Sequence, residues 1–413
     1  MISIHEALDA VLAAVRPLPS EEVPLLQALG RAAAERSVSP EQVPTFANSA
    51  MDGFAVSGAE LEGGRREFRV VVDIPAGRYV AEPVAPGNAA RIMTGAPLPP
   101  GADTVVQVEH TSVDDDLITV ETVPPTGANV RREGEDVSAG DVLFERGSRL
   151  GAAEIGLLAA VGIERVRVAR RPRVAILATG SELVAAGRQL APGQIRNSNS
   201  FTAYGQAVAA SADPILLGIA RDDPDETRRL LAAALENDVV VTSGGVSVGD
   251  YDFVKQVQDE LGVERRFWGV ATKPGKPLAF GTRNDTLVFG VPGNPVAAMV
   301  SFEMYVRPAI LALQGRPDIY RPWFYAASAE PVQRTKSRTE ARRCRLAHED
   351  GALRFSTTGP QGSGILSSMA GAEGLFFVPP QYPGGEVGEE LLVMLLSGSA
   401  SERPAYPVAP AVL

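Results

Sequence analysis

Two lysines in a short proline-rich loop are the first residues of this chain that could bind an anion. The sequence contains only four lysines, and Lys273 and Lys276 stand together in Lys-Pro-Gly-Lys-Pro. The prolines and the glycine keep this segment out of a helix, so both ammonium groups can be presented together. Two cations held side by side repel each other unless an anion joins them, and the pattern therefore predicts an anion site. The alternative is an ordinary basic turn exposed to solvent.

A glycine-rich segment, 242–252, carries the second group of candidate residues. It follows a predicted strand, and in open α/β sheets ligands bind beyond the carboxyl ends of strands. Glycines at such a place let backbone N–H groups approach an anion closely. This pattern favours a phosphate-binding segment over a glycine-rich turn that binds nothing.

Carboxylates stand near the ends of the same two predicted strands. Glu182 follows the strand 174–177, and Asp252 closes the glycine-rich segment. Both side chains are therefore expected at one edge of the sheet, beside the predicted anion site. Because Mg²⁺ prefers oxygen ligands, the pair predicts a magnesium site. The alternative is that each carboxylate only caps a turn.

Two further patterns in this region are a candidate anion site at a helix start and a candidate serine-hydrolase motif. Pro292, Gly293 and Asn294 join a buried strand to a helix, whose first amides could bind an anion. The segment 245–249 matches the G-x-S-x-G pattern of serine hydrolases, which requires a helix directly after the serine. Here two residues intervene, and the only downstream histidine, His348, lies in a β-rich segment. The sequence therefore argues against a serine hydrolase.

An α/β domain is needed to position these residues. Short apolar strands alternate with helical segments from 173 to 314, which is typical of a mainly parallel sheet covered by helices. Asp223-Pro224-Asp225-Glu226 has the cap, the first-turn proline and the glutamate that open a helix. The predicted strands are 174–177, 215–219, 238–241 and 287–291, and the other predicted helices are 201–210 and 295–313.

The remaining segments have a different pattern. Ser3-Ile4-His5-Glu6 is a capping box that opens an N-terminal helix, and helices are also expected at 25–36 and 151–161. Short β-type runs broken by glycine and proline fill 43–136, and the chain beyond Pro317 is β-rich again.

Composition excludes several classes of protein. The formal net charge of -11 argues against a general binder of nucleic acids or membrane surfaces, so an anionic ligand needs a local basic pocket. One cysteine, Cys344, and three scattered histidines cannot build a cysteine or histidine metal centre. There is no signal pattern and no uninterrupted apolar run of membrane-spanning length, so we expect a cytoplasmic location.

Taken together, these segments resemble the MoeA family, which includes the E domains of gephyrin. Each segment alone is a common loop pattern, but the ordered set is specific and runs over most of the chain. The matching stretches are 48–55, 91–97, 132–136, 179–183, 193–199, 243–252, 273–277 and 292–295.

The resemblance implies an elongated homodimer of multidomain subunits. It places the active cleft between the α/β domain of one subunit and the inserted domain of the other. The expected parts are a discontinuous helical domain (1–43 and 138–171), an inserted β-rich domain (44–137), a three-layer α/β domain (172–317), a C-terminal β-barrel (318–400) and a disordered tail (401–413).

The reaction implied by the resemblance is molybdenum insertion. Adenylylated molybdopterin and molybdate react, AMP leaves, and the dithiolene sulfurs bind molybdenum, with Mg²⁺ neutralising phosphate charge. Asp52 and Thr94 would reach in from the partner subunit, and Asp136 would support that cleft. The metal ligands implied are Glu182, Asp252 and either Asp222 or Asp223.

The resemblance also implies substrate-binding residues. Lys273 and Lys276 would hold molybdate or phosphate. The residues that would line the pterin phosphate site are Ser243, Gly244, Gly245 and Ser247. The segment 338–343 resembles the family's R-x-[DE]-F-x-R pattern, which makes Arg343 a molybdate candidate with Ser363 and Ser368 nearby.

Three positions depart from the family pattern. Gly269 stands where relatives often have Lys or Arg, Ala297 where many have Ser, and Ala341 where the arginine motif has an aromatic residue. None removes a carboxylate, but each could alter the affinity for the oxyanion. Two alternatives stay open: another nucleotide-processing enzyme with the same α/β domain, and a gephyrin-like scaffold without catalysis. Docking of other proteins of the pathway is a further expectation.

Overall fold

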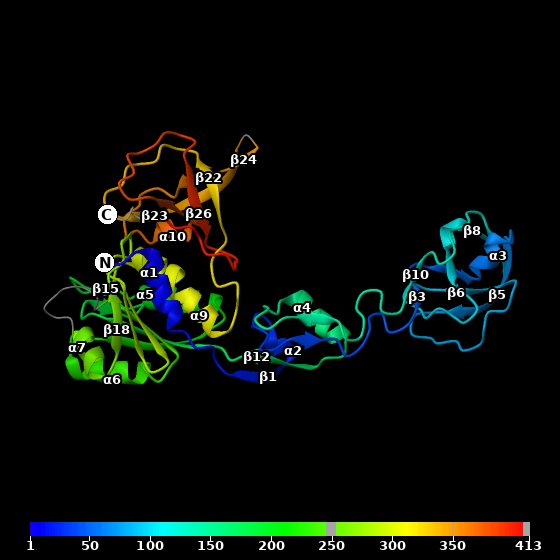
Figure 1. The fold of residues 1–413 in the computed structure, drawn as a ribbon, viewed down its shortest axis with the longest axis horizontal. Coiled ribbons are helices and arrows are strands. Elements are labelled where there is room, and N and C mark those ends of the chain that lie inside the picture. Colours follow the sequence, from blue (N-terminus) through cyan, green and yellow to red (C-terminus); the bar gives the residue numbers. More distant parts are fainter. Residues whose placement is uncertain (245–252, 350, 408–413) are drawn as a thin grey trace.

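The computed structural model describes residues 1–244, 253–349 and 351–407. Figure 1 shows an elongated molecule with an α/β body at one end and a separate β-rich domain at the other. A narrow connector joins the two, and a β-barrel packs on the α/β body. This arrangement separates the predicted site residues into two distant groups within one chain.

The α/β body is built on a six-stranded sheet in the order β16-β13-β17-β21-β20-β18. The first four strands are parallel and the last two are antiparallel, which confirms the predicted mainly parallel sheet. The strands are β13 (Arg173–Thr179), β16 (Asp213–Ala220), β17 (Val239–Ser243), β18 (Glu264–Trp268), β20 (Ala279–Arg283) and β21 (Thr286–Val291), with the short pair β14 (Leu183–Val184) and β15 (Ile195–Arg196).

Helices cover this sheet at the predicted places. Asp223 caps α6 by accepting a hydrogen bond from the Glu226 amide, as its sequence pattern predicts. The helices are α5 (Asn199–Ala209), α6 (Pro224–Ala234), α7 (Phe253–Glu260), α8 (Pro295–Ser301) and α9 (Arg307–Leu313), with a π-helical segment η2 (Phe302–Val306) joining the last two. The run Pro295–Leu313 is long and apolar enough to cross a membrane, but 89% of it is buried, so it is a core helix of this body.

The N-terminal helix α1 (Ile4–Ala13) also belongs to this body. The Ser3 capping box forms as predicted, and the apolar side of the helix, with Leu8 and Val11, joins the main hydrophobic core.

The expected helix 25–36 is wrong beyond α2 (Leu25–Ala28), because Gly30 adopts a left-handed φ of 78° and Ala32 and Ala33 then pair with other backbone segments. The connector is therefore not mainly helical: it holds α2, α4 (Ala152–Ala160), the antiparallel pair β1 (Ser20–Pro24) and β12 (Arg165–Ala169), and the pair β2 (Ser37–Val38) and β11 (Val142–Phe144).

The distal domain is a six-stranded sheet in the order β7-β4-β6-β5-β9-β8. Its apolar side chains, such as Phe54 and Phe68, form a core of their own. The elements are β4 (Gly53–Val56), α3 (Gly58–Glu62), β5 (Glu67–Ile74), β6 (Asn88–Ile92), β7 (Thr104–Gln107), η1 (Val108–His110), β8 (Thr111–Asp114) and β9 (Leu117–Val120), with the pair β3 (Asn48–Ser49) and β10 (Val130–Arg131) beside them.

The C-terminal strands close into a five-stranded barrel, because β23 pairs with both β24 and β25. The two-residue strand β19 (Thr272–Lys273), which precedes the barrel in the chain, pairs in parallel with the start of β23, and Lys273 lies opposite Glu340. This pairing brings the lysine loop to the barrel. The barrel elements are β22 (Trp323–Ser328), β23 (Thr339–Glu349), β24 (Ala352–Thr357), α10 (Ser367–Ala370), β25 (Gly374–Val378) and β26 (Glu390–Leu395).

The expectation of a disordered tail is wrong for residues 401–407. The ring of Tyr406 is buried and packs against Phe377 with ring centroids 5.0 Å apart. Arg403 forms an ion pair with Asp9 of α1 at 2.8 Å, and the Tyr406 carbonyl lies 3.1 Å from a ring nitrogen of His5. A composition rich in Ser, Pro and Ala predicts disorder, but the Tyr406 ring is buried between α1 and the barrel and holds this segment in place.

Candidate functional site

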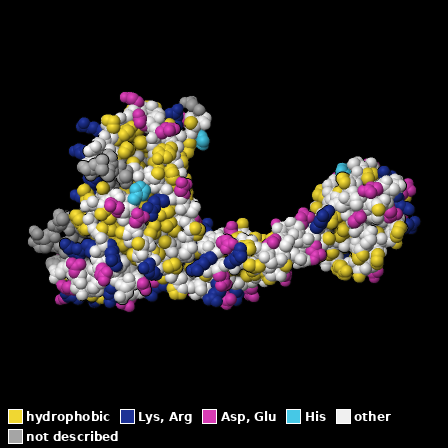
Figure 2. Space-filling view, viewed as in Figure 1, with side chains coloured by type: hydrophobic (Ala, Val, Ile, Leu, Met, Phe, Trp, Pro, Cys, Tyr) yellow, Lys and Arg dark blue, Asp and Glu magenta, His cyan; other side chains and the backbone are white. Residues whose placement is uncertain are grey.

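A basic cleft of about 1250 Å³ lies between the α/β body and the barrel. Three of the chain's four lysines line it, although the whole chain is acidic. Figure 2 shows acidic and basic side chains intermixed on one face of the molecule, whereas the lining of the cleft has seven basic and two acidic residues. Its charged residues are Lys273, Lys276, Arg334, Lys336, Arg338, Arg342 and Arg343, with Glu330 and Glu340.

The Lys-Pro-Gly-Lys-Pro loop forms one wall of the basic cleft. Gly275 has a left-handed φ of 103°, and a Cβ there would stand 2.9 Å from the Ser301 Oγ of α8. Only glycine fits this place without strain, and it holds the loop against the helix. Lys273 Nζ donates a hydrogen bond to Glu340 Oε1 at 2.9 Å, whereas exposed Lys276 forms no ion pair with any described residue.

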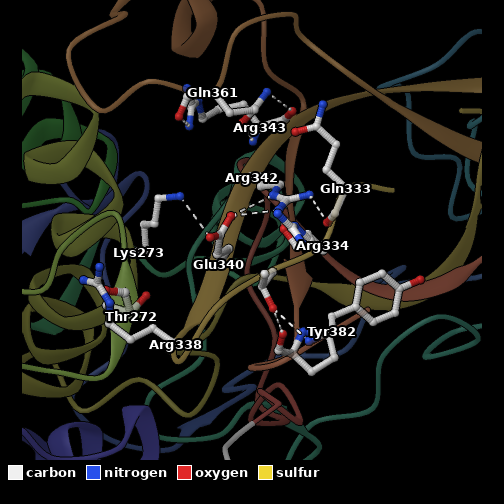
Figure 3. Close-up of polar contacts among 12 residues, drawn as sticks. Thr272, Lys273, Gln333, Arg334, Arg338, Glu340, Arg342, Arg343, Gln361 and Tyr382 are labelled. Atoms are coloured by element: carbon white, nitrogen blue, oxygen red, sulfur yellow. Dashed lines mark hydrogen bonds and ion pairs between the residues drawn. The ribbon is translucent and has the colours of Figure 1, made fainter. Parts of the chain in front are cut away.

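Glu340 and Arg342 form the floor of the basic cleft (Figure 3). Arg342 donates from Nε and Nη2 to Glu340 Oε2, at 3.0 and 2.8 Å, and from Nη1 to the Gln333 carbonyl at 2.9 Å. Burial alone would raise the pKa of Glu340, but the hydrogen bonds from Lys273 and Arg342 outweigh it and lower that pKa. The carboxylate is therefore ionised at neutral pH and sits among cations.

Arg343 also lines the basic cleft, but its guanidinium is bonded to neighbouring parts of the barrel. Its side chain is fully buried, and Nε donates to Ser368 Oγ at 3.0 Å. Its Nη atoms donate to the backbone carbonyls of Pro360, Gln361 and Gly362. In the structure Arg343 and Ser368 thus shape the 359–363 loop, and the molybdate contact that the resemblance implies for them stays a prediction.

At the carboxyl edge of the sheet, the turn after β21 lines the basic cleft with Pro292 and Asn294, and the end of β17 lies beside that turn. Asn199 Nδ2 donates to Ser243 Oγ and to the Gly293 carbonyl, both at 2.7 Å, and so joins the end of β17 to the turn before α8. Gly244 has a φ of 89°, and a Cβ there would lie 2.6 Å from the Thr179 carbonyl oxygen. The backbones of Gly244 and Thr179 therefore lie too close together for a side chain at position 244. The other predicted residues of this segment, Gly245, Ser247 and Asp252, lie outside the described residues.

The turn before α8 is less open to an anion than its sequence suggests. Asn294 and Pro295 begin the helix as predicted, and Pro292 and Asn294 line the basic cleft. However, the Val296 amide donates to the Ser363 carbonyl at 3.1 Å. One of the first amides of the helix is thus occupied by the barrel, and this contact ties the two domains together.

Two predicted metal ligands lie on adjacent loops at the same edge. The Asp222 carboxylate accepts a hydrogen bond from the Ser181 amide at 3.2 Å. Glu182 folds back over Gly180, where a Cβ would lie only 2.3 Å from Glu182 Oε2. Within 1–244, 253–349 and 351–407, no group of three or more His, Cys, Asp or Glu could hold a metal ion. Asp223, the alternative ligand, is used as the cap of α6.

Asp52 and Thr94 meet in the distal domain, although 42 residues separate them. The Thr94 amide and hydroxyl both donate to Asp52 Oδ1 at 2.7 Å. The backbone bond, and then the side-chain bond, lower the pKa of Asp52. Asp136 is exposed at the junction with the connector, its amide bonded to the Val43 carbonyl. Figure 1 shows this domain at the far end of the molecule from the α/β body and the barrel, whose residues line the basic cleft.

Sequence reasoning missed several cleft residues. Arg334, Lys336 and Arg338 lie on the segment between β22 and β23, and no function was assigned to them. The rarity of lysine in this chain was a usable signal for Lys336. Asn199 lies in a matching stretch but carried no predicted role, because only the fold shows that it bonds two loops.

Family models match almost the whole chain in three consecutive parts. Residues 2–162 match the MoeA N-terminal region (domain I and II), residues 175–312 a probable molybdopterin binding domain, and residues 325–396 the MoeA C-terminal region (domain IV).

Curated relatives and solved structures agree with these matches. The molybdopterin molybdenumtransferase of Haemophilus influenzae is 37% identical over 374 residues, covering 89% of this chain and 92% of that protein. The molybdopterin molybdenumtransferase of Bacillus subtilis is 34% identical over 413 residues, covering 98% and 96%. The crystal structure of the molybdopterin biosynthesis moeA protein from Pyrococcus horikoshii OT3 aligns with a TM-score of 0.80 and 29% identity, covering 96% of this chain and 100% of that one.

Proposed function

Because this chain belongs to the MoeA family of molybdopterin molybdenumtransferases, enzymes of molybdenum cofactor biosynthesis, we propose that it transfers molybdenum from molybdate to adenylylated molybdopterin and releases AMP. The observation that carries this proposal is the basic cleft beside the carboxyl edge of the sheet. An acidic chain that gathers three of its four lysines in one cleft provides for an anionic ligand there.

The cleft and the neighbouring edge of the sheet bind different substrates in this proposal. Lys276 is exposed and unpaired among the described residues, so it holds the oxyanion, with Lys273 beside it. Ser243 and Gly244, at the end of β17, take the phosphate of the pterin substrate, with Pro292, Gly293 and Asn294 from the neighbouring turn. Binding both substrates against one rigid edge brings the oxyanion close to the pterin.

Magnesium is part of this proposal. Glu182 and Asp222 supply carboxylate oxygens at the same edge, and Asp252, outside the described residues, completes the predicted set. Oxygen donors on adjacent loops fit a hard divalent ion. When bound there, Mg²⁺ would neutralise charge on the phosphate groups of the substrate.

A homodimer is also part of the proposal. Asp52 accepts two hydrogen bonds from Thr94 in the distal domain, which Figure 1 shows at the far end of the molecule from the α/β body and barrel. In this proposal a second subunit brings Asp52 and Asp136 to the basic cleft. Phe201, Tyr204 and Val208 follow helical spacing on α5 and are 55%, 42% and 50% exposed. An apolar stripe of this kind on a soluble enzyme favours burial against another copy.

A cytoplasmic location is the last part of the proposal. The single cysteine, Cys344, is a free and buried thiol, and chains without disulfides are typical of reducing compartments.

The test is AMP release from adenylylated molybdopterin, measured with and without molybdate and Mg²⁺. Release that needs both, with molybdenum retained on the pterin, is the expected result. Lys276→Ala should raise the molybdate requirement about tenfold, because one cation is lost from the cleft. Lys255→Ala, at an exposed position of α7, is the matched control and should leave the molybdate requirement unchanged. Absence of AMP release under every condition would contradict the proposal.

A further inference from the structure

A buried carboxylate in a cleft that binds anions is unexpected, because the carboxylate repels the ligand. The basic cleft has two acidic residues, and they are held differently. Glu330 accepts a hydrogen bond from the Thr357 amide at 2.7 Å and pairs with no cation among the described residues. Glu340 instead binds two cations, and Figure 3 shows it between Lys273 and Arg342.

The position of Glu340 is fixed by the backbone as well as by its ion pairs. Its residue lies opposite Lys273 in the β19–β23 pairing, and its side chain is only 10% exposed. Both carboxylate oxygens are engaged, Oε1 by Lys273 and Oε2 by Arg342. The carboxylate therefore cannot turn away when an anion enters, because its strand and both partners hold it.

Glu340 reduces the charge that the lysine loop presents. An ammonium group has three N–H donors, and Lys273 gives one of them to Glu340, which leaves two for a ligand. The nearby carboxylate nevertheless repels any anion that those donors bind. Lys276, three residues further on, has no such counter-ion among the described residues. The loop thus offers one full cation and one partly neutralised cation.

We propose that Glu340 sets the affinity of the basic cleft for doubly charged oxyanions and keeps that affinity low enough for the anion to leave its binding site for the reaction. This inference rests on the proposed function, in which the oxyanion is a substrate that must leave its binding site. Tight binding of a substrate before reaction does not by itself speed its conversion, so a built-in counter-charge favours turnover. Glu340 is an affinity-setting residue that acts through Lys273.

The first experiment measures anion binding by calorimetry at fixed ionic strength, on the full-length chain. Glu340→Gln keeps the shape of the side chain and removes its charge. Molybdate, a tetrahedral dianion, should bind about tenfold tighter, and perchlorate, a tetrahedral monoanion, only about threefold tighter, because Coulomb energy scales with the ligand charge. Equal or weaker binding of molybdate by the variant would show that Glu340 only orients Lys273, and would overturn the inference.

Two further variants keep the test specific. Glu330→Gln removes the other cleft carboxylate, and it should change molybdate affinity less than Glu340→Gln does. An equal gain in both variants would assign the effect to total cleft charge rather than to Glu340, and would also overturn the inference. In a Lys273→Gln background, Glu340→Gln should lose most of its effect, because the anion is then held by Lys276, which has no paired carboxylate among the described residues. If the unaltered chain binds neither anion, the proposed oxyanion role fails; if it binds molybdate without tightening in Glu340→Gln, only the present inference fails.

Discussion

Replacing Arg343 by lysine would keep the positive charge but remove the planar guanidinium and its spread of N–H donors. Nε of Arg343 donates to Ser368 Oγ at 3.0 Å. The Nη atoms donate to the carbonyls of Pro360, Gln361 and Gly362 at 3.3, 3.2 and 3.0 Å. A lysine has its donors on one atom and cannot reach acceptors spread along this loop, so about two bonds are lost. Each loss leaves a buried acceptor unpaired, which predicts a fall in unfolding free energy of roughly 3 kcal/mol.

Thermal unfolding followed by circular dichroism would measure this effect. At about 2–4 °C per kcal/mol, the midpoint of Arg343→Lys should fall by roughly 6–12 °C. The matched control is Arg345→Lys, two positions along the same strand, where an exposed guanidinium makes one bond to the Gly371 carbonyl at 3.3 Å. Its midpoint should move by less than about 2 °C, as is usual for surface substitutions.

Molybdate titration at a temperature where the variant is folded completes the test. Arg343→Lys should keep most of its molybdate affinity, since the guanidinium is buried behind the 359–363 loop. A variant that unfolds at the original midpoint but no longer binds molybdate would refute this reasoning. That result would mean that Arg343 contacts the anion directly.

Substitutions at three other positions test the tail, the distal domain and the lysine loop. Tyr406→Ala should lower the unfolding free energy by about 3 kcal/mol, because a buried ring is removed, whereas Y406F should cost less than about 1 kcal/mol; equal losses in denaturant unfolding would contradict the packing argument. Thr94→Val should raise the pKa of Asp52, so that this carboxylate takes up its proton at a higher pH than in the unaltered chain; an unchanged NMR titration would remove the hydroxyl from this role. Gly275→Ala should destabilise the chain by about 2 kcal/mol through its positive φ and the contact with Ser301, and an unshifted midpoint would show that the loop can move.

The central elements of the fold could be predicted because local signals and tertiary packing agree there. The strand β13 is an apolar run buried on both faces, and Asp223 caps α6 where its sequence places it. The helix expected at 25–36 failed because Gly30 and the backbone pairing of Ala32 override helix propensity. The tail could not be predicted from composition, since burial of the single Tyr406 ring decides its place.

The site was predictable in residue types but not in contacts. Lys273 and Lys276 line one cleft as the loop pattern suggested. The ion pair of Lys273 with Glu340 depends on strand pairing between segments 67 positions apart, which no local pattern encodes. The burial of Arg343 is likewise a tertiary property, and a motif that names an arginine does not say whether its guanidinium faces a ligand or the backbone.

The strand β19 gives the lysine loop two attachments. Its backbone pairs with β23 of the barrel, and two residues later Gly275 packs against Ser301 of α8. The loop is thus a brace between the two domains, and widening the cleft would require breaking one attachment or the other. The spacing of Lys273 and Lys276 is set when the protein folds, before any ligand arrives. Binding then needs little rearrangement of this wall, so the cleft is preorganised and should select oxyanions by size as well as by charge.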